Sequence, residues 1–262
     1  MREGANSLAR TMIVGVVSCE EDVVKHSRIT EEQVTPGRGG RGPVVAGTGV
    51  DQRPAMPATA SVVELRGKFV RLRPIQVADA EMTFRWRQSE RAALLNRGAR
   101  TVAEQVAWIA ARLPSEHNFI IELLATGRPV GMLSLTGIDV VHRHAEPGRF
   151  LIGEPEAVQG IPVAVEAMKL LYELAFERLA LIRVYGTVPA DNPLMLKWQK
   201  YLGMKEEGRL RSHYFLDGRF QDAICLGLLV DEYRAVTLPR MRVLIGATRP
   251  GRAGSTASME NR

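Results

Sequence analysis

Between residues 61 and 236 the apolar side chains recur every second residue in some segments and every third or fourth residue in others. The order of these segments along the chain is the feature that most constrains the fold. A spacing of two is typical of a strand with one buried face, whereas a spacing of three and four is typical of an amphipathic helix. The patterns predict the order β, α, α, β, β, β, α, β, α, β, β. Because strands and helices do not alternate strictly, we expect an α+β fold, an α/β three-layer arrangement with a mostly antiparallel, twisted, mixed sheet and helices on both faces.

Turn and cap residues mark where the predicted elements begin and end. Asp217-Gly218 lies between two apolar runs and is the most specific hairpin signal in the chain. Thr101 followed by Glu104 has the pattern of a capping box at the start of a helix. The apolar stripe of that helix is expected to consist of Val102, Val106, Ile109 and Leu113.

Two further helices are predicted in the second half of the chain. Asn192 is the expected N-cap of one, Pro193 its first residue and Gly203 its stop signal. The other begins near residue 163 and has one apolar and one polar face. Its polar, solvent-facing side is expected to carry Glu166, Lys169 and Glu173.

Composition divides the chain into three parts. Residues 36–60 are rich in Gly and Pro, contain no aromatic residue and lack an apolar period, so this stretch cannot bury enough surface to offset its ordering entropy. We therefore expect a flexible tail or linker over residues 1–60 and a folded domain over residues 61–236. The segment 237–262 has a similarly loose composition, and a second flexible tail is expected there.

Charge and cysteine content limit the possible partners. The net charge is +6 and the pI is near 9.6, but the arginines are spread along the chain, which disfavours a nucleic-acid ligand and favours anionic small molecules. Binding of nucleic acid through the basic tails is kept as an alternative. Two distant cysteines, Cys19 and Cys225, favour a reducing cytoplasmic location. We expect no membrane partner, because the longest apolar runs are too short for a membrane span.

The order of elements, with a turn and helix after the fourth strand and an Asn-initiated helix after the fifth, resembles the GNAT superfamily of acyl-CoA-dependent N-acetyltransferases over residues 64–234. In that family the turn has the pattern Q/R-x-x-G-x-G/A, and its amides hold the pyrophosphate of acetyl-CoA at a helix N-terminus. In this chain Pro162 replaces the central glycine, which removes one donor but suits a first helical position. The corresponding residues are Gln159, Gly160, Ile161, Pro162, Val163 and Ala164.

The resemblance implies acetyl-CoA as co-substrate and no metal. A second family motif, which follows the Asn with an L-Y-x-x-x-G-F ending, matches at Asn192 and Gly203. The tyrosine that commonly protonates the leaving thiolate is replaced by Gln199, and Tyr201 lies about 200° around the helix from it. The residues expected to bind acetyl-CoA are Leu151, Ile152, Gly153, Gln159, Gly160, Ile161, Val163, Ala164 and Asn192.

The resemblance further implies direct transfer of an acetyl group to a primary amine. Glu146, placed just before the fourth strand, is the first candidate for the catalytic base, and His144 is the second. The segment around Trp86 and Arg87 resembles the branch that acetylates amino-sugar nucleotides, where an indole face stacks and a guanidinium binds phosphate. His213 on a late strand is a third candidate for contact with the acceptor.

Two other functions fit the same residues. One is a protein N-terminal acetyltransferase of the ribosomal-protein type, whose partner is an N-terminal peptide rather than an amine-bearing small molecule. The other is a catalytically impaired domain that binds acyl-CoA as a regulator, which Pro162 and Gln199 favour. A second copy of the chain is a candidate partner in each case.

Overall fold

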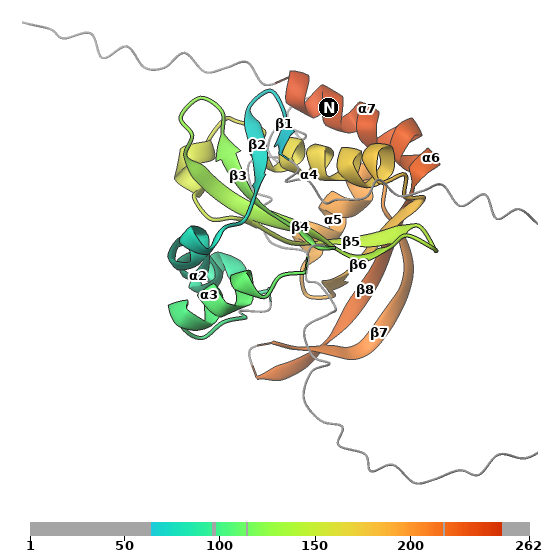
Figure 1. Ribbon diagram of the computed structural model, residues 1–262. Helices are drawn as coiled ribbons and strands as arrows, with labels where there is room; N and C mark the ends of the chain where they lie inside the picture. The colour runs from blue at the N-terminus through green and yellow to red at the C-terminus, as the bar shows by residue number, and fades with distance from the viewer. Residues whose placement is uncertain (1–63, 96–97, 114, 217, 248–262) are drawn as a thin grey trace, which may run out of the picture.

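One eight-stranded sheet runs through the protein in the order β1-β2-β3-β4-β5-β6-β8-β7 (Figure 1). The computed structural model describes residues 64–95, 98–113, 115–216 and 218–247, so the expected tail over residues 1–60 lies outside the described residues. Neighbouring strands are antiparallel except β5 and β6, which are parallel, and this confirms the expected mixed, mostly antiparallel sheet. The strands are β1 Leu65–Arg66, β2 Val70–Pro74, β3 His117–Leu123, β4 Pro129–Asp139, β5 His144–Ile152, β6 Arg183–Pro189, β7 Lys205–Leu216 and β8 Arg219–Leu229.

Helices cover both faces of this sheet, as expected (Figure 1). On one face lie α2 (Ala80–Gln88) and α3 (Val102–Ala110). On the other lie α4, α5 and α7. No helix in the described part of the chain is long and apolar enough to cross a membrane. The bounds of the remaining helical elements are η1 Val77–Asp79, η2 Glu90–Ala92, η3 Pro155–Val158, α4 Val163–Glu173, η4 Leu174–Arg178, α5 Pro193–Leu202, α6 Val230–Glu232, η5 Tyr233–Thr237 and α7 Leu238–Gly246.

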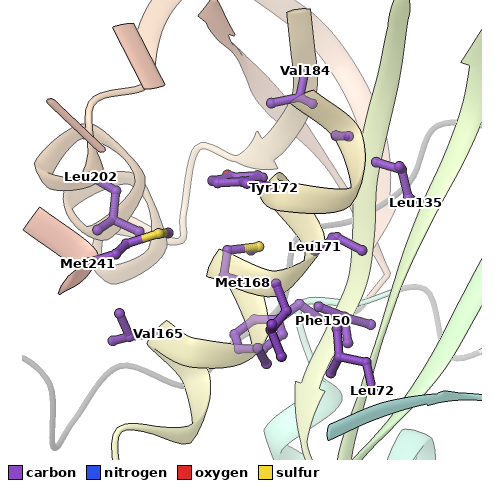
Figure 2. Packing of buried hydrophobic residues seen from close by; sticks show 14 of the residues in the cluster. Leu72, Leu135, Phe150, Val165, Met168, Leu171, Tyr172, Val184, Leu202 and Met241 are labelled. Atoms are coloured by element: carbon purple, nitrogen blue, oxygen red, sulfur yellow. The ribbon is translucent and has the colours of Figure 1, made fainter. Parts of the chain in front are cut away.

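The larger core lies between α4 and the sheet. Leu171 and Tyr172 of α4 are fully buried, as are Leu72 of β2 and Leu135 of β4, and Figure 2 shows these side chains gathered around the helix. Burying one large aliphatic side chain contributes roughly 1.5–3 kcal/mol to stability. The position of α4 on the sheet is therefore set mainly by apolar packing.

A smaller core lies on the α2/α3 face. There Trp86 of α2 packs with Leu95, Ile120 of β3, Met132 of β4 and Leu151 of β5. Successive side chains of a strand point to opposite faces of the sheet. Residues two positions from Ile120, Met132 or Leu151 in the same strand are therefore expected on this α2/α3 face.

The predicted caps and turns are present. Asn192 accepts a hydrogen bond from the Met195 amide at 3.1 Å, and Gly203 ends α5 with a positive φ of 115°. Thr101 accepts from the Glu104 amide at 3.1 Å, which is one half of the predicted capping box, whereas the Glu104 carboxylate accepts from the Arg100 amide at 2.7 Å instead of that of Thr101. The hairpin between β7 and β8 has Gly218 at φ 77°. These short-range signals were reliable because only a few residue types satisfy each backbone geometry.

The expected stripe of α3 needs a correction. Ile109 is buried, but Val102 is 38% and Leu113 61% exposed, and Gln105 is buried in their place. The Gln105 side chain donates to the Thr83 hydroxyl of α2 at 3.0 Å. A polar residue therefore lies between the two helices because it has a hydrogen-bond partner there.

The boundary expected at residue 236 also needs a correction, because the chain continues as α7. Met241 and Ile245, four residues apart, are buried against the larger core, and α7 packs on α4. Pro239 and two arginines made this segment look loose in the sequence, but one apolar face suffices to dock a helix. Residues 248–262 lie outside the described residues.

Replacing Met241 by alanine tests whether α7 belongs to the domain. The side chain is fully buried, so M241A is expected to lower the free energy of unfolding by about 2–4 kcal/mol through lost packing and a cavity. V243A is the matched control, because Val243 lies on the same helix and is 70% exposed, and its effect should stay below about 0.5 kcal/mol. Urea denaturation measures both. Equal, small effects would show that α7 does not contribute to the fold.

Candidate functional site

The two parallel strands β5 and β6 part soon after they meet. Their ladder consists of His144 with Arg183 and Ala145 with Val184, although β5 continues to Ile152 and β6 to Pro189. Beyond these pairs the edge of β5 that faces β6 has no ladder partner among the described residues. The result is an opening in the middle of the sheet, with the first turn of α4 beyond the end of β5 and that of α5 beyond the end of β6.

A bulge in β5 lies beside this opening. Arg149 has a positive φ of 51°, and the register with β4 shifts there by one residue. Its guanidinium is buried, donates to the Asn118 side chain at 3.0 Å and lies 3.5 Å from the carboxylate of Glu116. The same guanidinium lies over the Trp108 ring of α3. The strained strand position is thus held by a buried network that reaches across to α3.

The α2/α3 face of the sheet is polar next to the opening. Register places Glu146 opposite Thr136, and Gly148 opposite Ser134, on the same face as Met132. Glu146, Thr136 and Ser134 are each at most 2% exposed. A buried carboxylate at this place suits a cationic group or a proton transfer.

The same face carries a polar pair from the other side of the opening. Thr187 of β6 and Tyr214 of β7 share a buried hydrogen bond between their hydroxyl groups. Sequence analysis missed these two residues and Ser134, because a lone hydroxyl in a strand has no recognisable spacing. Strand register was the only signal that could have found them.

His144 begins β5, two residues before Glu146, so the two side chains lie on one face. Its ring is half-buried, meets the ring of Tyr185 edge-on at 5.3 Å, and its Nε2 lies 4.0 Å from the Asp139 carboxylate. The amides of His142 and Val141 donate to that carboxylate and hold the pKa of Asp139 below its ordinary value. The structure therefore brings together the two predicted catalytic residues, with Glu146 inside the strand rather than before it.

The predicted phosphate turn lies at the end of β5. Gln159 and Gly160 are exposed, and Gly160 has a positive φ of 75° with open space where a side chain would project. The amide of Ile161 donates to the Val158 carbonyl and that of Val163 to the Ile161 carbonyl, so both amides already have an acceptor, and contact of these two residues with acetyl-CoA stays a prediction. The remaining candidate donors are the amides of Gly160, Ala164 and Val165.

Helix α5 starts on the other side of the opening. Asn192 is 3% exposed, and its Nδ2 has no hydrogen-bond partner among the described residues. Gln199, two turns further on, is 1% exposed and its Oε1 likewise has no partner in the described part of the chain. Tyr201 is 40% exposed and stacks on Trp198, away from Gln199. A buried, unpaired Asn192 amide suits a site that an oxygen-rich ligand completes.

The structure places Trp86 in the core, which corrects its expected role as a stacking surface. The indole is 3% exposed and packs directly against Gly153, where any side chain would collide with it. Its Nε1 donates to the Glu154 carboxylate at 2.9 Å, and this bond is the main reason why the pKa of Glu154 lies below its ordinary value. Gly153 therefore has a packing role in addition to any contact with a ligand.

The other two predicted acceptor residues lie on α2 and β7. Arg87 is buried on α2 and lines a small pocket with Gly98, Ala99, Gln105 and Trp108. His213 is exposed on β7 and packs edge-on against Tyr214. Contact of either residue with an acceptor stays a prediction. The part of the chain that the structure describes holds no group of three or more His, Cys, Asp or Glu residues that could bind a metal ion.

Comparison with known proteins agrees with this geometry. A family model described as an acetyltransferase (GNAT) domain matches residues 70–205, from the start of β2 to the first residue of β7. Spermidine N(1)-acetyltransferase of Escherichia coli K12 is 31% identical over 121 residues, which cover 46% of this chain and 62% of that protein. A Bacillus subtilis protein described as a candidate ribosomal N-acetyltransferase is 32% identical over 111 residues, 42% of this chain and 59% of that protein.

Solved structures show the same fold. A GCN5-related N-acetyltransferase from Brucella melitensis superimposes with a TM-score of 0.59 at 23% identity, over 70% of this chain and 86% of that one. A candidate acetyltransferase from T. thermophilus gives a TM-score of 0.59 at 26% identity, over 71% of this chain and 99% of that one. The chain therefore belongs to the GNAT acetyltransferase family. It spans less than two thirds of the length of the two curated relatives named above.

Pro162 provides a test of the turn. GNAT acetyltransferases take acetyl-CoA as co-substrate, and P162A would return the backbone donor that proline lacks. If the turn holds the diphosphate, P162A should tighten acetyl-CoA binding by up to about tenfold, as one added hydrogen bond to a charged group allows. Isothermal titration measures this affinity. P155A is the matched control in the preceding short helix, and unchanged binding in P162A would show that this position does not face the phosphates.

Proposed function

We propose that this protein transfers an acetyl group from acetyl-CoA to a primary amine by direct attack. The observation that carries the proposal is the opening between β5 and β6, with the buried carboxylate of Glu146 on one of its walls. An extended donor can lie along the unpaired edge of β5, while the amine approaches from the α2/α3 face. Membership of the GNAT family supports the same chemistry.

The residues around the opening fit acetyl-CoA. Gly160, with its positive φ and open surroundings, and the amides of Ala164 and Val165 in the first turn of α4 can receive the diphosphate. The edge of β5 near Leu151 and Ile152 can bond the pantetheine arm, as one strand bonds the next. The unpaired Nδ2 of Asn192 is a further donor at the end of β6.

The reaction needs one proton acceptor and a site that positions two reactants. Glu146 takes the proton of the ammonium group, directly or through water, and the free amine then attacks the carbonyl carbon of the thioester. The new C–N bond forms as the C–S bond breaks, and CoA leaves as a thiolate. The attacking nitrogen then loses its second proton, and because Gln199 has no acidic proton to give, the CoA thiolate takes up that proton through water. His144, on the same strand face as Glu146, offers a route for the first proton to solvent.

The acceptor best supported is a cationic aliphatic amine. Burial of Trp86 removes the stacking face on which an amino-sugar nucleotide was expected, whereas a buried carboxylate favours a compact cation. The named function of the Escherichia coli relative makes spermidine the first acceptor to test. An N-terminal peptide is the second, since the Bacillus subtilis relative is described as a candidate ribosomal enzyme.

A non-catalytic acyl-CoA-binding domain is the second candidate function. Pro162 in the phosphate turn and Gln199 in the family's tyrosine position both favour it. The two functions differ in turnover, not in donor binding. Both predict that acetyl-CoA raises the unfolding midpoint, because the ligand binds only the native state.

Release of the CoA thiol distinguishes the two. Purified protein is incubated with acetyl-CoA and, in separate reactions, spermidine, an N-terminal ribosomal peptide and an amino-sugar nucleotide, and free thiol is followed with a colorimetric reagent. Catalysis predicts amine-dependent release with one acceptor class. Binding of acetyl-CoA without release for any amine supports the regulatory domain, and no binding at all contradicts both.

Glu146 provides the mutational test of the chemistry. E146Q keeps the size of the side chain but removes the base, so kcat should fall by about 10²- to 10⁴-fold while acetyl-CoA binding is kept. E206Q is the matched control, because Glu206 is an exposed carboxylate on β7 that pairs with Lys200. A kcat for E146Q within a factor of about three of the wild type would assign the base to another group.

A further inference from the structure

A second buried carboxylate lies in the first turn of α4. Glu166 is 3% exposed, although the sequence pattern placed it on the solvent face of the helix. Its Oε1 accepts from the Lys68 amide at 2.7 Å, and its Oε2 accepts from the amides of Phe69 and Val70 at 2.7 and 2.9 Å. One side chain therefore satisfies three consecutive backbone donors of the β1–β2 turn, nearly a hundred residues away in the sequence.

Gly67 makes room for this carboxylate. A Cβ atom at position 67 would lie 2.6 Å from the Glu166 Cδ, which is closer than nonbonded carbon atoms approach. The Gly67 amide closes the turn by donating to the Val70 carbonyl at 2.8 Å. The turn and the carboxylate thus form one close-packed unit, in which neither part can shift without breaking hydrogen bonds.

The same residue also closes the first turn of α4. The amide of Glu166 is the first to bond along the helix, donating to the Pro162 carbonyl at 3.0 Å. The amides of Ala164 and Val165 precede it and have no acceptor within the helix. Fixing Glu166 therefore fixes the direction in which these two amides point.

We propose that Glu166 is a positioning residue for acetyl-CoA: by anchoring the first turn of α4 to the β1–β2 turn, it aims the phosphate-facing amides at the donor. This inference rests on the proposed function, because it concerns the same ligand. The side chain of Glu166 faces the β1–β2 turn. It acts through the backbone of Ala164 and Val165.

If Glu166 acted only through its charge, its removal would change the affinity for acetyl-CoA in the direction opposite to that expected from positioning. A carboxylate near bound phosphates repels them, so its removal without any loss of order would tighten acetyl-CoA binding. Positioning predicts weaker binding, because the amides would no longer be held in place. The sign of the change in affinity therefore separates the two.

Two variants break the anchor in different ways. E166Q removes the charge and turns an amide group toward backbone donors, so it cannot accept all three bonds. G67A keeps the charge and displaces the carboxylate by steric contact. E173Q is the control for the first, since Glu173 lies at the other end of α4 and pairs with Lys169. G208A is the control for the second, because a Cβ atom there meets open space.

The affinity for acetyl-CoA is measured by calorimetry at a temperature at which circular dichroism shows each variant to be folded. We expect Kd to rise about tenfold in both E166Q and G67A, and to stay within about twofold in both controls. In the thiol-release assay the KM for acetyl-CoA should rise while kcat is kept, which a loss of folded protein would not produce.

Three outcomes would overturn the inference. Unchanged or tighter binding in E166Q, or unchanged binding in a folded G67A, contradicts positioning while the proposed function stands. Should E166Q fail to fold, the G67A result decides. If the wild-type protein does not bind acetyl-CoA, the proposed function fails first and the role of Glu166 in positioning the donor fails with it.

Discussion

The parting of two parallel strands is the constraint on which the rest of the site depends. β5 and β6 share two residue pairs and then separate, so the middle of the sheet has an open edge. Unpaired backbone groups at such an edge are costly when buried, unless a ligand or water satisfies them. Around this edge lie the bulge at Arg149, the polar face around Glu146 and the starts of α4 and α5, and it is here that we propose donor and acceptor meet.

The elements around the opening are held by different forces. Apolar packing sets α4 on the sheet, whereas hydrogen bonds to the buried carboxylate of Glu166 set the direction of its first turn. The larger core therefore stabilises the position of α4 on the sheet, and the Glu166 carboxylate fixes the orientation of its first turn. On the opposite face of the sheet, the buried Arg149 guanidinium likewise fixes local geometry through polar contacts, because it links the β5 bulge to α3.

Much of the fold could be predicted from the sequence, because caps, turns and apolar periods are local. Asn192, Gly203 and Gly218 each meet a backbone geometry that few residues satisfy. The site was harder to predict, because burial depends on partners far away in the chain. Trp86 is in the core because Gly153 makes room for it, and Glu166 is buried because a distant turn offers it three donors. α7 was missed because two apolar residues four apart gave too weak a period among proline and arginines.

Backbone hydrogen exchange with and without CoA tests the central claim most directly, since it reports on each segment of the chain separately. If the donor lies along the open edge of β5 and its diphosphate meets the first turn of α4, CoA should slow exchange over residues 146–153 and 163–166. Exchange in α2 and along the β7–β8 hairpin should change little. Protection confined to those latter elements, or no protection at saturating CoA, would contradict the account.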